Sequence, residues 1–455
     1  MLRSFFHRLV PASRPAGQTA FSTLSRIDLE LRHCSRADVA VRVLNKAKPH
    51  LCSLMRERFG SPAAEALTLK ILNLFLTRYH LESRSGSVLS RPFGLVMDTS
   101  NACQLACPGC VHSSQSEALH RFVWPNGTLP ERVLSAFLKC YGPWAIAVNF
   151  YNYGEPLLNL NTPKFIRMAK NFLLTTSIST SLSVRRFDTE AYVESGLDHM
   201  ELSIDGATQA VYQRFRRNGD LELVMSNIRK LVEAKRVLGK SSPVLSWNFL
   251  AFEHNVHEIP DALRMAGTLG VDQFRVVNPF EVSWDDPEIR PAKIESRIYR
   301  LDRPSVVPQP SNWNPFSDSV DEPAIMQAFD NSWIDQVVKD SPPSSGHTCH
   351  WLYKNIVMDA TGRIMPCCGA PRPDINLVFG AFDGKGGDSF NSEKYRQARD
   401  WFAGRASPTG DDPHCTCCEW DQTTANIGGP EIRGYFEAAD EVFFDYQSVR
   451  LLSNW

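Results

Sequence analysis

The chain lacks an apolar run long enough to cross a bilayer. Its best candidate, Ala66–Leu76, is interrupted by Lys70 and Asn73, whereas a spanning helix needs about 20 predominantly apolar residues. It also lacks an excess of charge, because 49 Lys and Arg against 50 Asp and Glu leave a formal net charge of −1. We therefore expect neither a transmembrane segment nor a nucleic-acid partner.

A convincing secretory signal is also missing. Residues 1–27 contain Arg3, Arg8, Arg14 and Arg26 and no acid, which superficially suggests a transit peptide, but a basic start without regular structure is the preferred interpretation. We expect a cytoplasmic protein. Cysteines in a reducing cytosol are typically metal-binding or catalytic rather than disulfide-bonded. The 12 cysteines are therefore the first residues to interpret.

Three cysteines share one short segment. Cys103-Gln-Leu-Ala-Cys107-Pro-Gly-Cys110 follows the strand-like run 93–97. Three thiolates can hold three irons of a cubane [4Fe–4S] cluster and leave the fourth iron open, whereas ferredoxin-type segments supply a fourth cysteine. The next cysteine here, Cys140, lies far along the chain. The alternative is a tetrahedral zinc site with His112 as its fourth ligand.

This spacing resembles that of the radical S-adenosylmethionine (radical SAM) enzymes. The resemblance implies that the open iron binds the amino and carboxylate groups of S-adenosylmethionine. Its reductive cleavage then gives a 5′-deoxyadenosyl radical that abstracts hydrogen from a substrate. One departure is Gly109, which stands where the family often has an aromatic residue.

A second motif, Tyr153-Gly154-Glu155-Pro156, ends the apolar run 145–150. It is similar to the family's Gly-Gly-Glu-Pro motif, with Tyr153 replacing the first glycine. The resemblance implies that the backbone of Tyr153 and Gly154 pairs with the ammonium of S-adenosylmethionine, and that Glu155 adds a charge partner.

A third motif joins Ser203-Ile-Asp205-Gly206 to Tyr212-Gln-Arg-Phe-Arg216-Arg-Asn-Gly219. It resembles the corresponding stretch of radical SAM proteins that carry a C-terminal SPASM or twitch extension. By that resemblance, Ser203 and Arg216 lie near the methionine and ribose of the cofactor. Asp205 is expected to shape the turn. Asn248 is a further cofactor-binding candidate at the mouth of the fold, and Arg275 is another polar candidate there.

Strands and helices alternate through the middle of the chain. The predicted strands are 93–98, 145–150, 177–182, 199–204, 245–251 and 273–277, and the predicted helices are 129–140, 162–173, 188–196, 221–238 and 258–269. Apolar runs separated by amphipathic helices favour a parallel sheet covered by helices. Six such units agree with the partial (β/α)6 TIM-like barrel that the resemblance implies, in which ligands collect at the carboxyl ends of the strands.

Six more cysteines gather near the C-terminus. Cys349 precedes a predicted β-hairpin with its turn at Asp359–Gly362, Cys367-Cys368 follows it, and His414-Cys415-Thr-Cys417-Cys418 comes later. This stretch resembles a twitch-type, shortened SPASM domain. The resemblance implies an auxiliary [4Fe–4S] cluster ligated by Cys349, Cys367, Cys415 and Cys418, with Cys368 and Cys417 as spares. A zinc ribbon is the alternative.

We expect an α/β protein of five parts. They are a helical N-terminal extension (1–90) with helices near 36–59 and 62–82, the barrel (91–280), a proline-rich linker (281–346), the auxiliary cluster domain (347–430) and a tail (431–455). The apolar face of the second helix, with Leu67, Ile71, Leu74, Phe75 and Leu81, is expected to pack on the barrel. Residues 323–340 are expected to hold a helix.

The predicted function is that of a radical SAM oxidoreductase-like enzyme with one auxiliary cluster. We expect net oxidation or rearrangement of a small-molecule or lipid-like substrate, with a flavodoxin or ferredoxin as the one-electron reductant. A peptide substrate, crosslinked or epimerised, is the alternative. Two further alternatives are a non-catalytic iron–sulfur electron carrier and a zinc-binding interaction protein.

Overall fold

The computed structural model describes residues 27–113, 125–279, 286–308, 349–367, 378–382 and 388–406, apart from short gaps within these ranges. The predicted helix at 323–340 and the cysteines at 368, 415, 417 and 418 lie outside the described residues.

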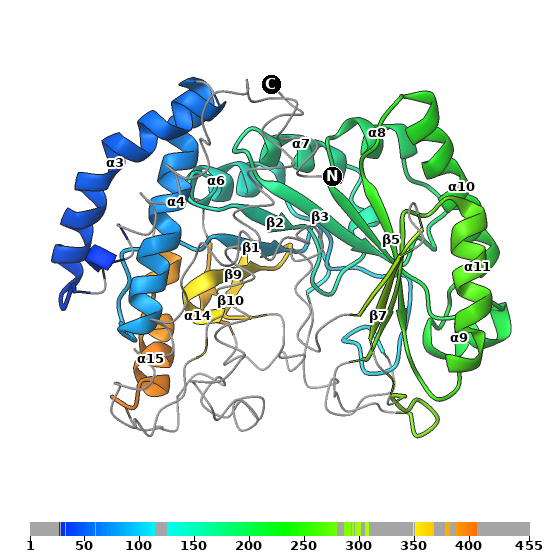
Figure 1. Cartoon of the computed structure of the whole chain (residues 1–455). Coiled ribbons are helices and arrows are strands. Elements are labelled where there is room, and N and C mark those ends of the chain that lie inside the picture. The colour runs from blue at the N-terminus through cyan, green and yellow to red at the C-terminus, as the bar shows by residue number, and fades with distance from the viewer. Residues whose placement is uncertain are drawn as a thin grey trace.

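Six parallel strands form the centre of the molecule (Figure 1). They are β1 (Gly94–Met97), β2 (Ala147–Asn149), β3 (Thr175–Thr180), β4 (His199–Ser203), β5 (Val244–Leu250) and β6 (Gln273–Val277). Each strand pairs in parallel with the next along the chain. The predicted partial (β/α)6 barrel is confirmed.

Helices connect these strands and cover the outer face of the sheet (Figure 1). They are α6 (Glu131–Tyr141), α7 (Thr162–Lys170), α8 (Thr189–Glu194), α9 (Gln209–Phe215), α10 (Leu221–Val237) and α11 (Ile259–Leu269), with 3-10 turns η1 (Pro156–Leu158) and η2 (Val256–Glu258). Side chains on alternate faces of a strand separate an apolar face from a polar one. In β4, Met200 and Leu202 join the core beneath the helices, while Glu201 and Ser203 face the other way.

The helix predicted over 221–238 is confirmed as α10, and a break separates it from α9, which ends at Phe215 before α10 begins at Leu221. The break has a local cause, because Asn218 adopts a positive φ of 66° and Asp220 caps α10 by accepting the Leu223 N–H. It matters for the site, since Arg216 lies in the break.

The C-terminal segment extends the barrel sheet. Strand β9 (Asn355–Met358) pairs in parallel with β1, and β10 (Arg363–Met365) pairs antiparallel with β9, which confirms the predicted hairpin. Strand β11 (Gly380–Ala381) follows, with helices α14 (Trp351–Lys354) and α15 (Glu393–Phe402) and the turn η4 (Ser389–Asn391). Aromatic side chains of this segment share the barrel's core. The described part of the expected cluster domain is therefore continuous with the barrel.

The other edge of the sheet carries β7 (Arg297–Arg300) and β8 (Ser305–Pro308), antiparallel to β6 and to each other. These two strands lie in the segment expected to be a linker. Their short length agrees with the expectation that prolines limit regular structure there.

The N-terminal extension is helical, as predicted, with α3 (Ala37–Phe59) and α4 (Ser61–Glu82). Leu67, Ile71 and Phe75 pack mainly against α3 rather than on the barrel. Part of the predicted face does reach the barrel, because Leu81 belongs to the barrel's core and Leu74 packs against that core. Buried Lys70 of α4 also contacts the barrel and donates to the carbonyls of Gly142 and Ala145. In the part of the chain that the structure describes, no helix has the length and apolarity needed to span a membrane.

Candidate active site

The cysteine loop, residues 98–113, follows β1 at the carboxyl edge of the sheet. Its three cysteines belong to one apolar cluster with Phe215 and Phe252, which come from α9 and from the end of β5. Cys107 is buried, Cys103 and Cys110 are half-buried, and the Cys110 N–H donates to the Cys107 carbonyl. The fold thus brings the three predicted ligands together where the barrel strands end.

The three thiols are unfavourable places for a bare negative charge. Burial raises the pKa of Cys103, that of Cys107, and that of Cys110, the last to about 12. The negative charges of neighbouring thiolates add to the effect at Cys103 and Cys110. Thiolates are the form that ligates iron. A cationic group held among these sulfurs would therefore relieve the cost, which is the environment that an iron–sulfur cluster fits.

Zinc fits this loop less well. Among the described residues, no group of three or more His, Cys, Asp or Glu side chains converges on a single-ion site. Each thiolate of a cubane binds a different iron, so a cluster does not need such convergence. His112, the expected fourth zinc ligand, instead contacts the Tyr153 carbonyl oxygen through Nε2 at 3.2 Å. His112 is therefore engaged by the loop of residues 152–155, and the identity of the metal group on these cysteines stays a prediction.

Asp98 organises the Tyr-Gly-Glu-Pro loop. Its Oδ1 accepts the backbone N–H groups of Asn152, Tyr153 and Gly154 at 2.9, 3.0 and 2.9 Å, an arrangement typical of an anion in a backbone nest. Sequence reasoning missed this residue. Its position at the end of β1, where barrel ligands collect, was the available signal.

Gly154 is required by close packing. A Cβ placed on it would lie 1.5 Å from the Ser100 carbonyl oxygen, so any other residue would force the two loops apart. The Glu155 N–H donates to the Ala102 carbonyl at 2.8 Å, directly before Cys103. These contacts hold the loop of residues 152–155 against the cysteine loop.

Glu155 is buried and its carboxylate is engaged by the protein. Oε1 accepts from the Leu157 N–H and the Thr180 hydroxyl, and Oε2 accepts from the N–H and hydroxyl of Ser181. Burial raises its pKa, and these donors oppose the shift. The carboxylate ties the loop after β2 to the end of β3. Its predicted role as a charge partner of the cofactor stays a prediction.

Arg216 and Asp205 form an ion pair beside the cysteines. Arg216 Nε donates to Asp205 Oδ2 at 2.5 Å, and its Nη1 lies 3.9 Å from the Cys107 sulfur. Although burial disfavours the charge, the Asp205 carboxylate raises the pKa of Arg216, so the guanidinium stays positive. Asp205 Oδ1 also accepts the Leu250 N–H at 2.6 Å. Asp205 therefore positions Arg216 as well as joining the β4 turn to β5.

Ser203 and Asn248 are neighbours in the sheet, paired in register across β4 and β5. The Ser203 hydroxyl lies 3.2 Å from that of Ser179. Asn248 Nδ2 donates to Glu201 Oε2 at 3.0 Å, while its buried Oδ1 has no hydrogen-bond partner among the described residues. A buried acceptor of this kind costs free energy until a donor reaches it. Asn248 therefore retains the capacity to bind a donor group.

Arg275 lies on the same polar face. It is paired in register with Asn248, is 4% exposed, and lies 3.9 Å from Glu201 through Nη1. The face opposite the helices is thus hydrogen-bonding and charged along β4, β5 and β6. Near β1 and β9 it is apolar, with Val96, Val357 and Met365 packed together beside Trp351.

The described part of the second cysteine group contains Cys349 and Cys367. Both are half-buried; Cys349 packs on the main core before α14, and Cys367 follows β10. Because β9 pairs with β1, this hairpin lies directly beside the strand that leads to the cysteine loop. The four-cysteine ligand set stays a prediction.

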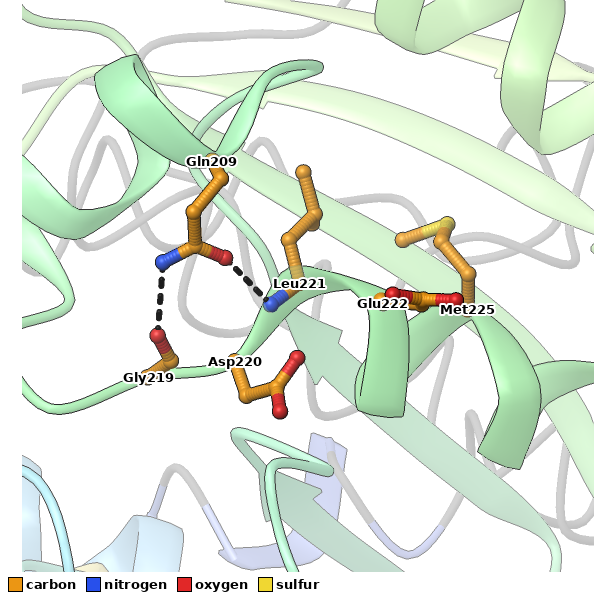
Figure 2. Close-up of a pocket in the computed structure, with 6 residues that line it drawn as sticks. All are labelled: Gln209, Gly219, Asp220, Leu221, Glu222 and Met225. Atoms are coloured by element: carbon orange, nitrogen blue, oxygen red, sulfur yellow. Dashed lines mark hydrogen bonds between the residues drawn. The ribbon is translucent and has the colours of Figure 1, made fainter.

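A separate open pocket of about 570 Å³ lies where α10 begins. Figure 2 shows Gln209 bridging the Gly219 carbonyl and the Leu221 N–H, with Asp220, Glu222 and Met225 completing the lining. None of the predicted site residues lines it.

Comparison with known proteins agrees with this geometry. Residues 97–265 match the model of the radical SAM superfamily. A cysteine loop after the first strand of a parallel partial barrel defines a class of iron–sulfur proteins that bind S-adenosylmethionine. Residues 97–265 of the chain therefore form a radical SAM domain, and proteins with this domain use a [4Fe–4S] cluster and S-adenosylmethionine.

Curated relatives are distant. The PqqA peptide cyclase of Gluconobacter oxydans (strain 621H) is 22% identical over 290 residues, covering 63% of this chain and 73% of the relative. The PqqA peptide cyclase of Methylobacterium nodulans is 25% identical over 292 residues, covering 62% and 68%. Among solved structures, Streptococcus suis SuiB bound to S-adenosylmethionine has a TM-score of 0.43 at 14% identity, covering 82% of this chain and 81% of that one.

Proposed function

We propose that this radical SAM protein abstracts a hydrogen atom from a polar substrate at the barrel mouth and directs it to net oxidation, rearrangement or ring closure. The observation that carries the proposal is the gathering of Cys103, Cys107 and Cys110 in one apolar cluster beside Arg216. When bound, the cluster and S-adenosylmethionine supply a 5′-deoxyadenosyl radical, and that chemistry belongs to the cofactors.

The residues of the chain itself bind and orient S-adenosylmethionine. Arg216, held by Asp205, places a permanent positive charge near Cys107 and the carboxylate end of the cofactor. Glu155 and Gly154 fix the loop that faces the methionine end. Ser203 and Asn248 supply hydrogen-bonding groups for the ribose, and the free acceptor Asn248 Oδ1 supports this role.

An auxiliary [4Fe–4S] cluster completes the proposal, with Cys349, Cys367, Cys415 and Cys418 as ligands. The pairing of β9 with β1 supports it, since a cluster on this hairpin lies near the first cluster. Such a cluster would accept the second electron or bind the substrate. A flavodoxin or ferredoxin would supply the first electron.

The substrate is proposed to be polar. Glu201, Asn248 and Arg275 make a polar wall along β4, β5 and β6. Burying a lipid chain against this wall would leave the Asn248 Oδ1 acceptor, which has no hydrogen-bond partner among the described residues, unsatisfied. A peptide substrate is the second candidate, favoured by the two relatives named as PqqA peptide cyclases. Ring closure within a peptide is then the expected outcome.

The test of the function is production of 5′-deoxyadenosine. The full chain is reconstituted anaerobically with iron and sulfide, reduced with dithionite and given S-adenosylmethionine, and the product is quantified by chromatography. We expect about eight irons per chain, no zinc, and 5′-deoxyadenosine from the wild type. Cys103→Ala should abolish the product, whereas Cys140→Ala, a half-buried cysteine on α6, should leave it unchanged.

Two results would contradict the proposal. Iron-loaded wild type that yields no 5′-deoxyadenosine would indicate an electron carrier. Stoichiometric zinc in anaerobically purified protein would indicate a zinc-binding interaction protein.

A further inference from the structure

At one buried carboxylate of the site, only one of the two oxygens accepts hydrogen bonds from the described residues. Asp98 is 1% exposed. Its Oδ1 accepts three backbone N–H groups from the loop of residues 152–154, but its buried Oδ2 has no hydrogen-bond partner among the described residues. An unsatisfied buried carboxylate oxygen is costly, and proteins retain few of them without a reason.

The surroundings of Asp98 do not compensate this charge. The nearby Asp359 carboxylate acts in the same direction as burial, and together they raise the pKa of Asp98 to about 7. Asp359 itself is paired with Arg363, whose Nε donates to Asp359 Oδ2 at 2.6 Å. His112 contacts the same loop through the Tyr153 carbonyl oxygen at 3.2 Å.

A cationic hydrogen-bond donor is the group that would satisfy Oδ2, since it supplies both a proton and a compensating charge. The proposed function brings one such group to this place. In S-adenosylmethionine the sulfonium has no hydrogen to donate, whereas the α-ammonium has three. The loop held by Asp98 lies against Ser100 and Ala102, immediately before Cys103.

We propose that Asp98 binds the α-ammonium group of S-adenosylmethionine through Oδ2, while Oδ1 holds the loop of residues 152–154 in place. This assignment rests on the proposed function. It gives the methionine end of the cofactor a full negative charge as partner, which the engaged carboxylate of Glu155 is less able to supply. It also explains why the protein keeps an acid at a position where its charge is disfavoured without ligand.

Two substitutions of Asp98 distinguish the roles of its two carboxylate oxygens. Asp98→Asn keeps an oxygen for the three backbone donors but removes the charge and the acceptor at Oδ2. Asp98→Ala removes both. Asp198→Asn is the control, because Asp198 is also fully buried but accepts its donors from Thr176 and Lys170, next to the amino end of β4.

Binding is measured anaerobically by calorimetry on cluster-loaded, oxidised protein, in which no cleavage occurs. The probes are S-adenosylhomocysteine, which carries the ammonium, and 5′-methylthioadenosine, which lacks it. We expect Asp98→Asn to weaken S-adenosylhomocysteine at least tenfold and 5′-methylthioadenosine less than twofold, with wild-type iron content. Asp198→Asn should change neither dissociation constant.

Three outcomes would overturn the assignment. They are unchanged affinity of Asp98→Asn for S-adenosylhomocysteine, equal losses for both probes, and an equal selective loss in Asp198→Asn. Failure of the proposed function would appear separately, as absence of 5′-deoxyadenosine from the wild type even though the probes bind.

Discussion

At the residue scale, the polar groups of the site differ in how many of their hydrogen-bonding atoms are already used by the protein. Glu155 gives both its oxygens to four protein donors. Asn248 and Asp98 each keep one buried acceptor that has no hydrogen-bond partner among the described residues. The sequence motifs named Glu155 and Asn248 as candidates. The hydrogen-bond partners of each residue depend on the fold. They show that Glu155 stabilises the loop structure, whereas Asn248 and Asp98 each keep an atom that can accept a hydrogen bond from a ligand.

Glu155→Gln should therefore act on stability. The amide would place an N–H₂ group where two protein donors already point, leaving buried groups unsatisfied at a cost of about 1–3 kcal/mol. The measurement is urea unfolding of the cluster-free chain. Glu131→Gln, which removes the exposed pair with Lys164, should cost about 0–1 kcal/mol. Equal unfolding free energies for Glu155→Gln and wild type would contradict the proposed role of Glu155 in stabilising the fold.

Asp98 also predicts a pH dependence. Because its pKa in the folded protein is raised to about 7, the carboxyl is largely protonated at pH 6 and ionised at pH 8. An ammonium ligand binds the ionised form, so S-adenosylhomocysteine should bind more tightly as pH rises from 6 to 8. Asp98→Asn should flatten this profile in calorimetric titrations, and a profile shared by both proteins would assign the titration to another group.

At the element scale, the C-terminal hairpin braces the cysteine loop. The Asp98 N–H donates to the Met358 carbonyl at 3.0 Å, and Asn101 Oδ1 accepts the Ala360 N–H at 2.8 Å. Asn101 Nδ2 and N–H also donate to the carbonyls of Pro125 and Gly127. One asparagine thus joins the cysteine loop to two other segments.

Asn101→Ala should disturb the first cluster as well as the fold. We expect lower stability together with an altered electron paramagnetic resonance spectrum of the reduced cluster on addition of S-adenosylmethionine. Asn73→Ala is the control, because Asn73 is equally buried and makes three hydrogen bonds, between α4 and the barrel. It should lower stability and leave the spectrum unchanged. A wild-type spectrum from Asn101→Ala would limit this residue to stability.

At the scale of the whole molecule, α4 packs against the barrel through a buried lysine. Lys70 is 2% exposed, and burial lowers its pKa to about 7. Above that pH the side chain is therefore largely neutral. Its amine still offers two N–H donors to the carbonyls of Gly142 and Ala145. The folded chain then binds fewer protons than the unfolded chain between pH 7 and about 10, and stability should rise with pH across this window.

Lys70→Met should reduce that rise, since its side chain has no proton to lose. The measurement is the urea unfolding free energy at pH 7, 8 and 9 for both proteins. Identical slopes against pH would show that Lys70 stays charged when buried.

The sequence by itself determined the local features of this protein. The order of strands and helices, the spacing of Cys103, Cys107 and Cys110, and the turn at Asp359–Gly362 follow from the period of apolar residues and from short-range chemistry, so they were predictable. The tertiary structure decided what depends on contacts between distant segments. It joined β9 to β1, placed Arg216 against Cys107 and, within the part of the chain that the structure describes, left one oxygen of Asp98 without a hydrogen-bond partner. Such contacts follow from how strand ends meet at one edge of a sheet, and a linear pattern of residues does not encode which buried groups find partners there.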